Sequence, residues 1–142
     1  MPIIQWYPGH MAKAIRQVEE KLKLVDVVFE LVDARIPVSS RNPMIESVIK
    51  DKPHLLILTK ADLADPQETQ RWLEYFRKNG DHAVALNSKE PSTEKIILKH
   101  TRAILADKLE NWESRGIKKT EIKSMCIGIP NVGKSNLAKP SG

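Results

Sequence analysis

Apolar and polar residues alternate along the chain with two different periods, and each period predicts a different kind of element. Over residues 11–24 apolar side chains recur every three or four positions, with charged and amide side chains between them, which predicts an amphipathic helix. The apolar stripe consists of Met11, Ala14, Ile15, Val18 and Leu22, and it continues to Val25. Residues 41–50, 66–79 and 93–114 have the length and spacing of further helices.

Short apolar runs between these helices are typical of buried strands. The first covers residues 26–33, is rich in β-branched and aromatic side chains, and is interrupted by one glutamate. Similar runs cover residues 54–59, 83–87 and 124–129. Four strands that alternate with helices predict an α/β fold, a three-layer arrangement with a parallel sheet and helices on both faces.

Composition fits one small domain, and charge favours a polyanionic partner. The chain has 142 residues, of which 41% are hydrophobic, enough to bury a core. Its net charge of +5 favours RNA as a partner, although a solvated basic surface explains the charge as well. The single cysteine, Cys126, cannot form an internal disulfide and is expected to be a small buried hydrophobe. Without a signal peptide or a long apolar stretch, the protein is expected to be cytoplasmic, with no membrane contact.

A complete phosphate-loop pattern follows the last predicted strand. Residues 128–135, GIPNVGKS, match G-x-x-x-x-G-K-[ST] at every specified position. In such a loop, backbone N–H groups and the positive end of the next helix bind phosphate. Lys134 is expected to reach the β- and γ-phosphates and Ser135 to bind Mg²⁺, while Val132, Gly133 and Asn136 are expected to contact the same nucleotide. A glycine-bearing turn between strand and helix is the alternative.

Asn131 lies inside this loop and has two interpretations. Its carboxamide oxygen is a hard ligand that suits a monovalent cation beside the phosphates. Potassium-activated GTPases resemble the chain at this loop position, which suggests K⁺ as a second cation. A turn-forming asparagine explains the residue equally well.

A candidate base-reading element, residues 59–62 (TKAD), ends a predicted strand, where open α/β sheets place ligand contacts. It resembles the NKxD guanine-specificity motif with Thr59 in place of Asn. The carboxylate of Asp62 can accept hydrogen bonds from guanine N1–H and N2–H₂, which adenine does not offer. The stem of Lys60 can lie across the base or brace the phosphate loop. Taken alone, a helix start with an aspartate cap explains these residues equally well.

The next predicted strand ends in Asn87-Ser88-Lys89, which resembles the short S-A-K element that supports the O6 side of guanine. Asn87 and Ser88 are therefore expected to contact the nucleotide. Their place one strand after the NKxD-like motif corroborates the guanine interpretation. An ATPase is the rival, because a phosphate loop cannot read the base.

Five segments together resemble the circularly permuted ribosome-biogenesis GTPases. They are residues 6–11 (WYPGHM), 33–37 (DARIP), 41–43 (RNP), 59–62 and the phosphate loop. In that family the base-reading motifs precede the phosphate loop, as here, and the fold is a P-loop NTPase (Ras-like) sheet in permuted order. The resemblance implies GTP and GDP as ligands, Mg²⁺ as cofactor, and hydrolysis by phosphoryl transfer to water. It also implies the large ribosomal subunit and its rRNA as partners during late assembly; a monomer is the expected state.

The resemblance assigns a role to one histidine and leaves another segment without one. It implies that His10 supplies or positions the water-activating group that other GTPases take from a switch glutamine, and an imidazole is suited to this. A structural histidine at a helix start is the alternative. The Asp33-Ala34-Arg35 segment marks the family: Asp33 could cap a turn and Arg35 could face phosphate or RNA. No catalytic role is assigned to either.

Residues 136–142, which follow the phosphate loop, are too few for a switch loop and a DxxG strand. Because family members are longer, residues 1–142 are expected to be a partial GTP-binding domain, incomplete at the C-terminus, without switch regions or the C-terminal helical domain. In the Ras-like order the four strands would be adjacent, with an exposed edge strand near the phosphate loop. Two alternatives remain: a nucleotide-binding fragment without turnover, and an RNA-binding scaffold indifferent to nucleotide that uses Lys118, Lys119, Lys123 and the first helix.

Overall fold

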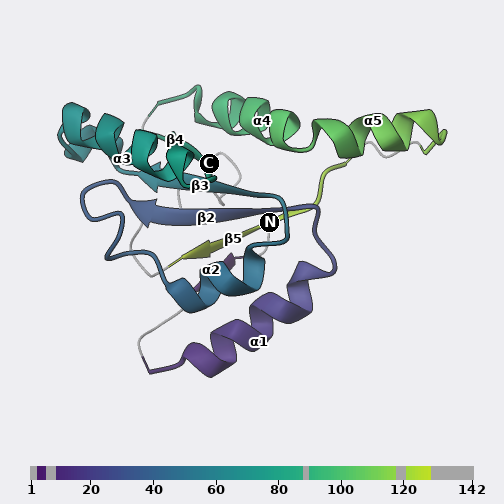
Figure 1. The fold of residues 1–142 in the computed structure, drawn as a ribbon, viewed down its shortest axis with the longest axis horizontal. Coiled ribbons are helices and arrows are strands. Elements are labelled where there is room, and N and C mark those ends of the chain that lie inside the picture. Colours follow the sequence, from purple (N-terminus) through teal and green to yellow (C-terminus); the bar gives the residue numbers. More distant parts are fainter. Residues whose placement is uncertain (1–2, 6–8, 88–89, 118–120, 129–142) are drawn as a thin grey trace.

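A computed structural model describes residues 3–5, 9–87, 90–117 and 121–128, and it contains one sheet of parallel strands (Figure 1). The strands are β1 (Ile3–Gln5), β2 (Val27–Asp33), β3 (His54–Thr59), β4 (His82–Ala85) and β5 (Ser124–Gly128). The helices are α1 (Met11–Leu22), α2 (Pro43–Ile49), α3 (Pro66–Lys78), α4 (Thr93–Ile104) and α5 (Ala106–Ser114), with a 3₁₀ turn, η1 (Ala61–Leu63). The strand order is β1-β5-β2-β3-β4. The predicted parallel α/β fold is confirmed.

Helices cover both faces of this sheet, and alternate residues of β2 show which helix covers which face. Val28 packs in a cluster with residues of α1 and α2, and Val32 packs with residues of α3. Phe29 points the other way, into a cluster with residues of α4 and α5. In Figure 1, α1 and α2 lie together along the lower side of the view, and α4 and α5 follow one another along the upper side. From β2 the chain passes through α2 and α3 on one face to the edge strand β4. It then returns through α4 and α5 on the other face to β5, as right-handed crossovers require.

The sheet has one strand more than the apolar pattern predicts. β1 pairs in parallel with β5, with Ile4 opposite Ile127 and Gln5 opposite Gly128. The four predicted strands are adjacent, as expected, and β1 lies beside β5 as the edge strand on the phosphate-loop side of the sheet. Three residues are too few to show a period, so the apolar pair Ile3-Ile4 gave no usable strand signal.

Helix boundaries follow local chemistry. The Oδ1 of Asn42 accepts a 2.8 Å hydrogen bond from the Met44 amide, and Pro43 occupies the first position of α2, so this helix begins two residues later than predicted. The single helix predicted over 93–114 was also wrong, because α4 ends at Ile104 and α5 begins at Ala106. Leu105, the residue between the two helices, is 1% exposed and belongs to the core.

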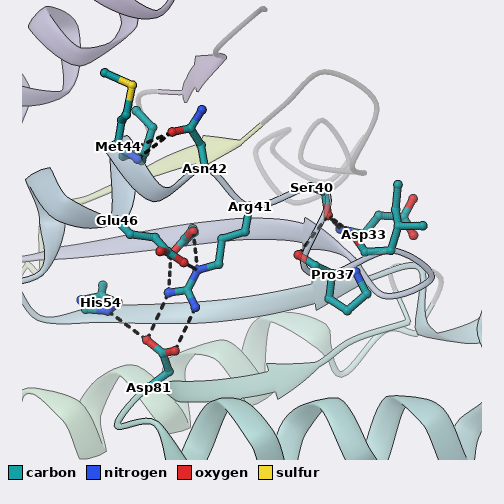
Figure 2. Close-up of polar contacts among 12 residues, drawn as sticks. Asp33, Pro37, Ser40, Arg41, Asn42, Met44, Glu46, His54 and Asp81 are labelled. Atoms are coloured by element: carbon teal, nitrogen blue, oxygen red, sulfur yellow. Dashed lines mark hydrogen bonds and ion pairs between the residues drawn. The ribbon is translucent and has the colours of Figure 1, made fainter.

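An ion cluster surrounds the glutamate that interrupts the apolar run of β2. Glu30 is buried, and its two oxygens accept hydrogen bonds of 2.9 and 3.1 Å from the guanidinium of Arg41. The same guanidinium donates to both oxygens of Asp81, forms an ion pair with Glu46 and lies 5.5 Å from the ring centre of Phe76. Figure 2 shows Arg41 reaching from its loop toward Asp81. Arg41 therefore ties the 41–43 motif to β2, α2 and the start of β4.

Titration of this cluster is governed by burial and by hydrogen bonds. Desolvation raises the pKa of Glu30, and the hydrogen bonds from Arg41 oppose that rise. Burial of Asp81 would raise its pKa, but hydrogen bonds from His54 and Arg41 hold that pKa at about 2. In turn, the hydrogen bond with Asp81 raises the pKa of His54, whose Nε2 lies 3.5 Å from the carboxylate. The cluster lies at the edge of the sheet where β3 and β4 begin, so we assign it to the fold rather than to the nucleotide site.

Candidate functional site

The parallel strands bring their carboxyl ends to one edge of the sheet, which is where the sequence places its candidate site. Asp33, at the end of β2, is paired with Thr59 at the end of β3, and Leu58 is paired with Ala85 at the end of β4. Gly128 ends β5 on the other side of β2. Ligand sites in open α/β sheets lie outside these ends.

The base-reading segment leaves β3 through an unusual turn. Lys60 has φ 59° and ψ 35°, and it is the one non-glycine residue with a positive φ in the described part of the chain. A non-glycine residue in this left-handed region costs about 1–2 kcal/mol and often marks a functional position. The amide of Ala61 then donates a 3.1 Å hydrogen bond to the carbonyl of Leu86. The turn therefore carries η1, with Asp62, toward the end of β4.

This arrangement places Asp62 and Asn87 around one pocket of about 250 Å³. Its lining residues are Ala61, Asp62, Ala85, Leu86, Asn87, Glu90 and Ile96. Asp62 is exposed, so its carboxylate is accessible to a ligand. A pocket lined by two acidic residues, one asparagine and several apolar residues offers hydrogen-bond acceptors and an apolar surface to a purine base.

Thr93 supports two residues that line this pocket, Asn87 and Glu90, and no sequence motif predicts that role. It is 7% exposed, and its hydroxyl lies 3.1 Å from the carbonyl of Asn87 and 2.8 Å from that of Glu90. The amide of Glu90 also donates to the Asn87 carbonyl. These contacts hold the carbonyl groups of Asn87 and Glu90 against the start of α4.

Thr59 has a buried, supporting position at the end of β3. It is 1% exposed, and its hydroxyl donates a 3.1 Å hydrogen bond to the carbonyl of Val32. The side chain therefore ties β3 to β2 just before the turn. A direct contact between Thr59 and nucleotide stays a prediction.

The Asp33-Ala34-Arg35 segment forms a closed turn at the end of β2. The amide of Arg35 donates to Oδ1 of Asp33, as expected of a turn cap, and its guanidinium donates to Oδ1 at 3.0 Å and to Oδ2 at 2.7 Å. These hydrogen bonds lower the pKa of Asp33. The Nζ of Lys60 lies 3.7 Å from Oδ2. The segment therefore connects the end of β2 with the base-reading turn.

His10 lies just before α1 and is exposed. Its side chain makes no capping hydrogen bond to the helix. It is five positions after Gln5, which pairs with Gly128 at the end of β5, so His10 lies within about 18 Å of Gln5 along the chain. This position is compatible with the expected role, and that role stays a prediction.

The remaining site residues lie outside the described part of the chain. These are Ser88, Asn131, Val132, Gly133, Lys134, Ser135 and Asn136, so of the phosphate loop only Gly128 is placed. The expected Mg²⁺ ligand Ser135 and K⁺ ligand Asn131 are among them. In the described ranges, no three His, Cys, Asp or Glu side chains are arranged to hold a metal ion, and no helix there has the length and apolar character to cross a membrane.

Comparison with known proteins shows which proteins the chain resembles. No protein-family model matches the chain. Over 135 residues it is 52% identical to the ribosome biogenesis GTPase A of Priestia megaterium, a match that covers 94% of the chain and 47% of that protein. The chain is a homologue of the ribosome biogenesis GTPases.

Solved structures place this homologue in a P-loop fold. The crystal structure of GNP-bound YlqF from T. maritima matches with a TM-score of 0.67 at 29% identity, covering 88% of the chain and 46% of YlqF. A GDP-bound YlqF structure matches with a TM-score of 0.65 at 28% identity, covering 86% and 45%. The expected circularly permuted GTPase fold is therefore confirmed. The chain spans about half the length of the ribosome biogenesis GTPase A that it matches.

Proposed function

We propose that residues 1–142 form the guanine-nucleotide-binding part of a cytoplasmic GTPase that acts in late assembly of the large ribosomal subunit. The observation that carries this proposal is the pocket shared by Asp62 and Asn87 at the carboxyl edge of the sheet. Its chemistry agrees with a homologue named ribosome biogenesis GTPase A. The similarity to GNP-bound and GDP-bound YlqF supports the same nucleotide class.

The strand order predicts how the nucleotide would lie across the edge of the sheet. The base pocket lies at the ends of β3 and β4, and the strand that leads into the phosphate loop, β5, lies two places from β3 with β2 between them. Two strand spacings amount to about 10 Å, a span that a nucleotide bridges. We therefore expect the base over η1, with Asp62 accepting from N1–H and N2–H₂, and the phosphates over the end of β5.

Hydrolysis requires the phosphate loop, whose residues after Gly128 lie outside the described ranges. We propose that Lys134 binds the β- and γ-phosphates and that Ser135 holds Mg²⁺, which neutralises phosphate charge in such sites. We also propose Asn131 as a K⁺ ligand and His10 as the group that positions the attacking water. The net charge of +5 suits contact with rRNA.

Titration of the chain with GTP, GDP and ATP tests the nucleotide assignment. GTP and GDP are expected to bind at least about 100-fold more tightly than ATP, because adenine leaves the Asp62 carboxylate without its donors. Lys134→Ala is expected to abolish triphosphate binding. Equal affinity for ATP would instead identify an ATPase.

Two further measurements separate the remaining functions. Single-turnover hydrolysis, with and without large ribosomal subunits, distinguishes a GTPase from a nucleotide-binding fragment without turnover. RNA affinity measured over a range of salt concentrations, with and without GDP, tests the scaffold alternative. Steeply salt-dependent RNA binding by a chain that binds no nucleotide would favour the scaffold over the proposal.

A further inference from the structure

The Asp33 carboxylate is held more firmly than a turn cap requires. A single hydrogen bond from the Arg35 amide, 2.9 Å to Oδ1, is enough to close the turn. The guanidinium of Arg35 adds a two-point contact, with one donor to each carboxylate oxygen. Asp33 is 5% exposed. This geometry fixes the carboxylate as an oriented negative charge at the end of β2.

Lys60 lies where that charge acts on the base-reading turn. Asp33 pairs with Thr59 across the sheet, and the amide of Ala34 extends this pairing with a 2.8 Å bond to the Thr59 carbonyl. Lys60 is the next residue, and its Nζ lies 3.7 Å from the Oδ2 of Asp33. The side chain of Lys60 is thus drawn toward β2.

The main chain leaves Lys60 in the opposite direction. Lys60 has a left-handed backbone conformation, which non-glycine residues rarely adopt. The following amide, from Ala61, bonds to Leu86 beyond β4. One residue therefore has its side chain anchored on the β2 side and its backbone on the β4 side. Asp62 follows on η1, so its position depends on both anchors.

We propose that Asp33, braced by Arg35, is a positioning residue for guanine recognition: it holds the Lys60 ammonium and thereby the turn that presents Asp62 to the base pocket. This inference rests on the proposed function. It gives the Asp33-Ala34-Arg35 segment a role that acts through another residue. The lowered pKa of Asp33, caused first by its hydrogen bonds to Arg35, agrees with a carboxylate that stays ionised in this contact.

A double-mutant cycle tests the inference, with the affinity for a fluorescent GDP analogue as the readout. Asp33→Asn is expected to weaken GDP binding by about tenfold, in the range of couplings between contacting residues. Lys60→Met, which keeps most of the stem, is expected to weaken it by at least as much. If Asp33 acts through Lys60, the double variant binds no more weakly than Lys60→Met alone. Asp33→Glu is expected to restore part of the affinity.

Controls separate positioning from loss of structure. Asp51→Asn changes an exposed carboxylate beside the opposite edge of the sheet, where β3 begins, and is expected to leave GDP affinity unchanged. Thermal unfolding of each variant checks the fold. If Asp33→Asn does not fold, Arg35→Gln takes its place in the cycle, because it removes the brace and leaves the carboxylate.

The outcomes have distinct meanings. Unchanged GDP affinity in Asp33→Asn, or losses that simply multiply in the double variant, would overturn the positioning role and leave the proposed function intact. A wild-type chain that binds no guanine nucleotide would overturn both.

Discussion

The amide of Ala61 donates a 3.1 Å hydrogen bond to the carbonyl of Leu86. This bond joins the turn after β3 to the residue that follows β4, and Asp62 and Asn87 line one pocket as a result. The two candidate base contacts come from separate motifs, and neither motif identifies the other. Main-chain pairing between neighbouring strand ends is what makes them one site.

Asp62→Asn is expected to change base preference. Guanine nucleotides should bind about 100-fold more weakly, because a carboxamide cannot accept from both guanine donors. Xanthosine nucleotides should gain affinity, since their O2 accepts from the new amide. Competition between GDP and xanthosine diphosphate measures the change, with Asp107→Asn on α5 as an exposed control. An unchanged preference for guanine would refute the role of Asp62.

Arg41→Met is expected to destabilise the fold by about 3–5 kcal/mol, because it leaves the buried Glu30 and its neighbour Asp81 without their shared cation. Urea unfolding at neutral pH measures the loss. Arg71→Met is the matched control: Arg71 pairs with Glu68 on the exposed side of α3, and exposed pairs contribute about 0–1 kcal/mol. Equal losses in the two variants would show that the cluster does not stabilise the fold.

His54→Gln is expected to change how stability depends on pH. The hydrogen bond with Asp81 raises the folded-state pKa of His54 above its ordinary value of 6.5. Protonation therefore stabilises the folded chain. That contribution is fully present below pH 6.5 and is lost as pH rises through the raised pKa.

Unfolding free energies of wild type and His54→Gln, measured from pH 5 to pH 9, test this. The difference between them should be larger at the acid end. In an Asp81→Asn background the pH dependence of the difference should shrink, because the partner that raises the pKa of His54 is gone. Curves that stay parallel across the range would contradict the assignment.

Asn42→Ala is expected to cost about 1 kcal/mol of stability, the usual loss for a helix cap. Its Oδ1 accepts from the Met44 amide, and its Nδ2 lies 3.5 Å from the sulfur of Met11 at the start of α1. Asn42→Asp keeps the cap acceptor and should retain most of the stability. If Asn42→Ala unfolds at the same urea concentration as wild type, the cap contributes nothing.

Local patterns were sufficient for most of the elements and for the resemblance to known GTPases. The strand and helix periods depend on neighbouring residues, and so do the phosphate-loop and NKxD-like motifs, whose residues are close in sequence. Thus β2, β3, β5 and the α/β class were predictable before any contact was known. The homology to the ribosome biogenesis GTPases agrees with the same motifs.

Only the tertiary structure decided which of these elements lie together. The pairing of β1 with β5 depends on burial of Ile4 against a strand at the other end of the described chain. Arg41 meets Asp81 across 40 residues, and no local period marks such a contact. The left-handed turn at Lys60 likewise follows from its two anchors, Asp33 on β2 and the bond from Ala61 to Leu86. Sequence determined the chemistry available to the site, and long-range strand pairing determined its geometry, because parallel strands are joined by contacts that neighbouring residues do not encode.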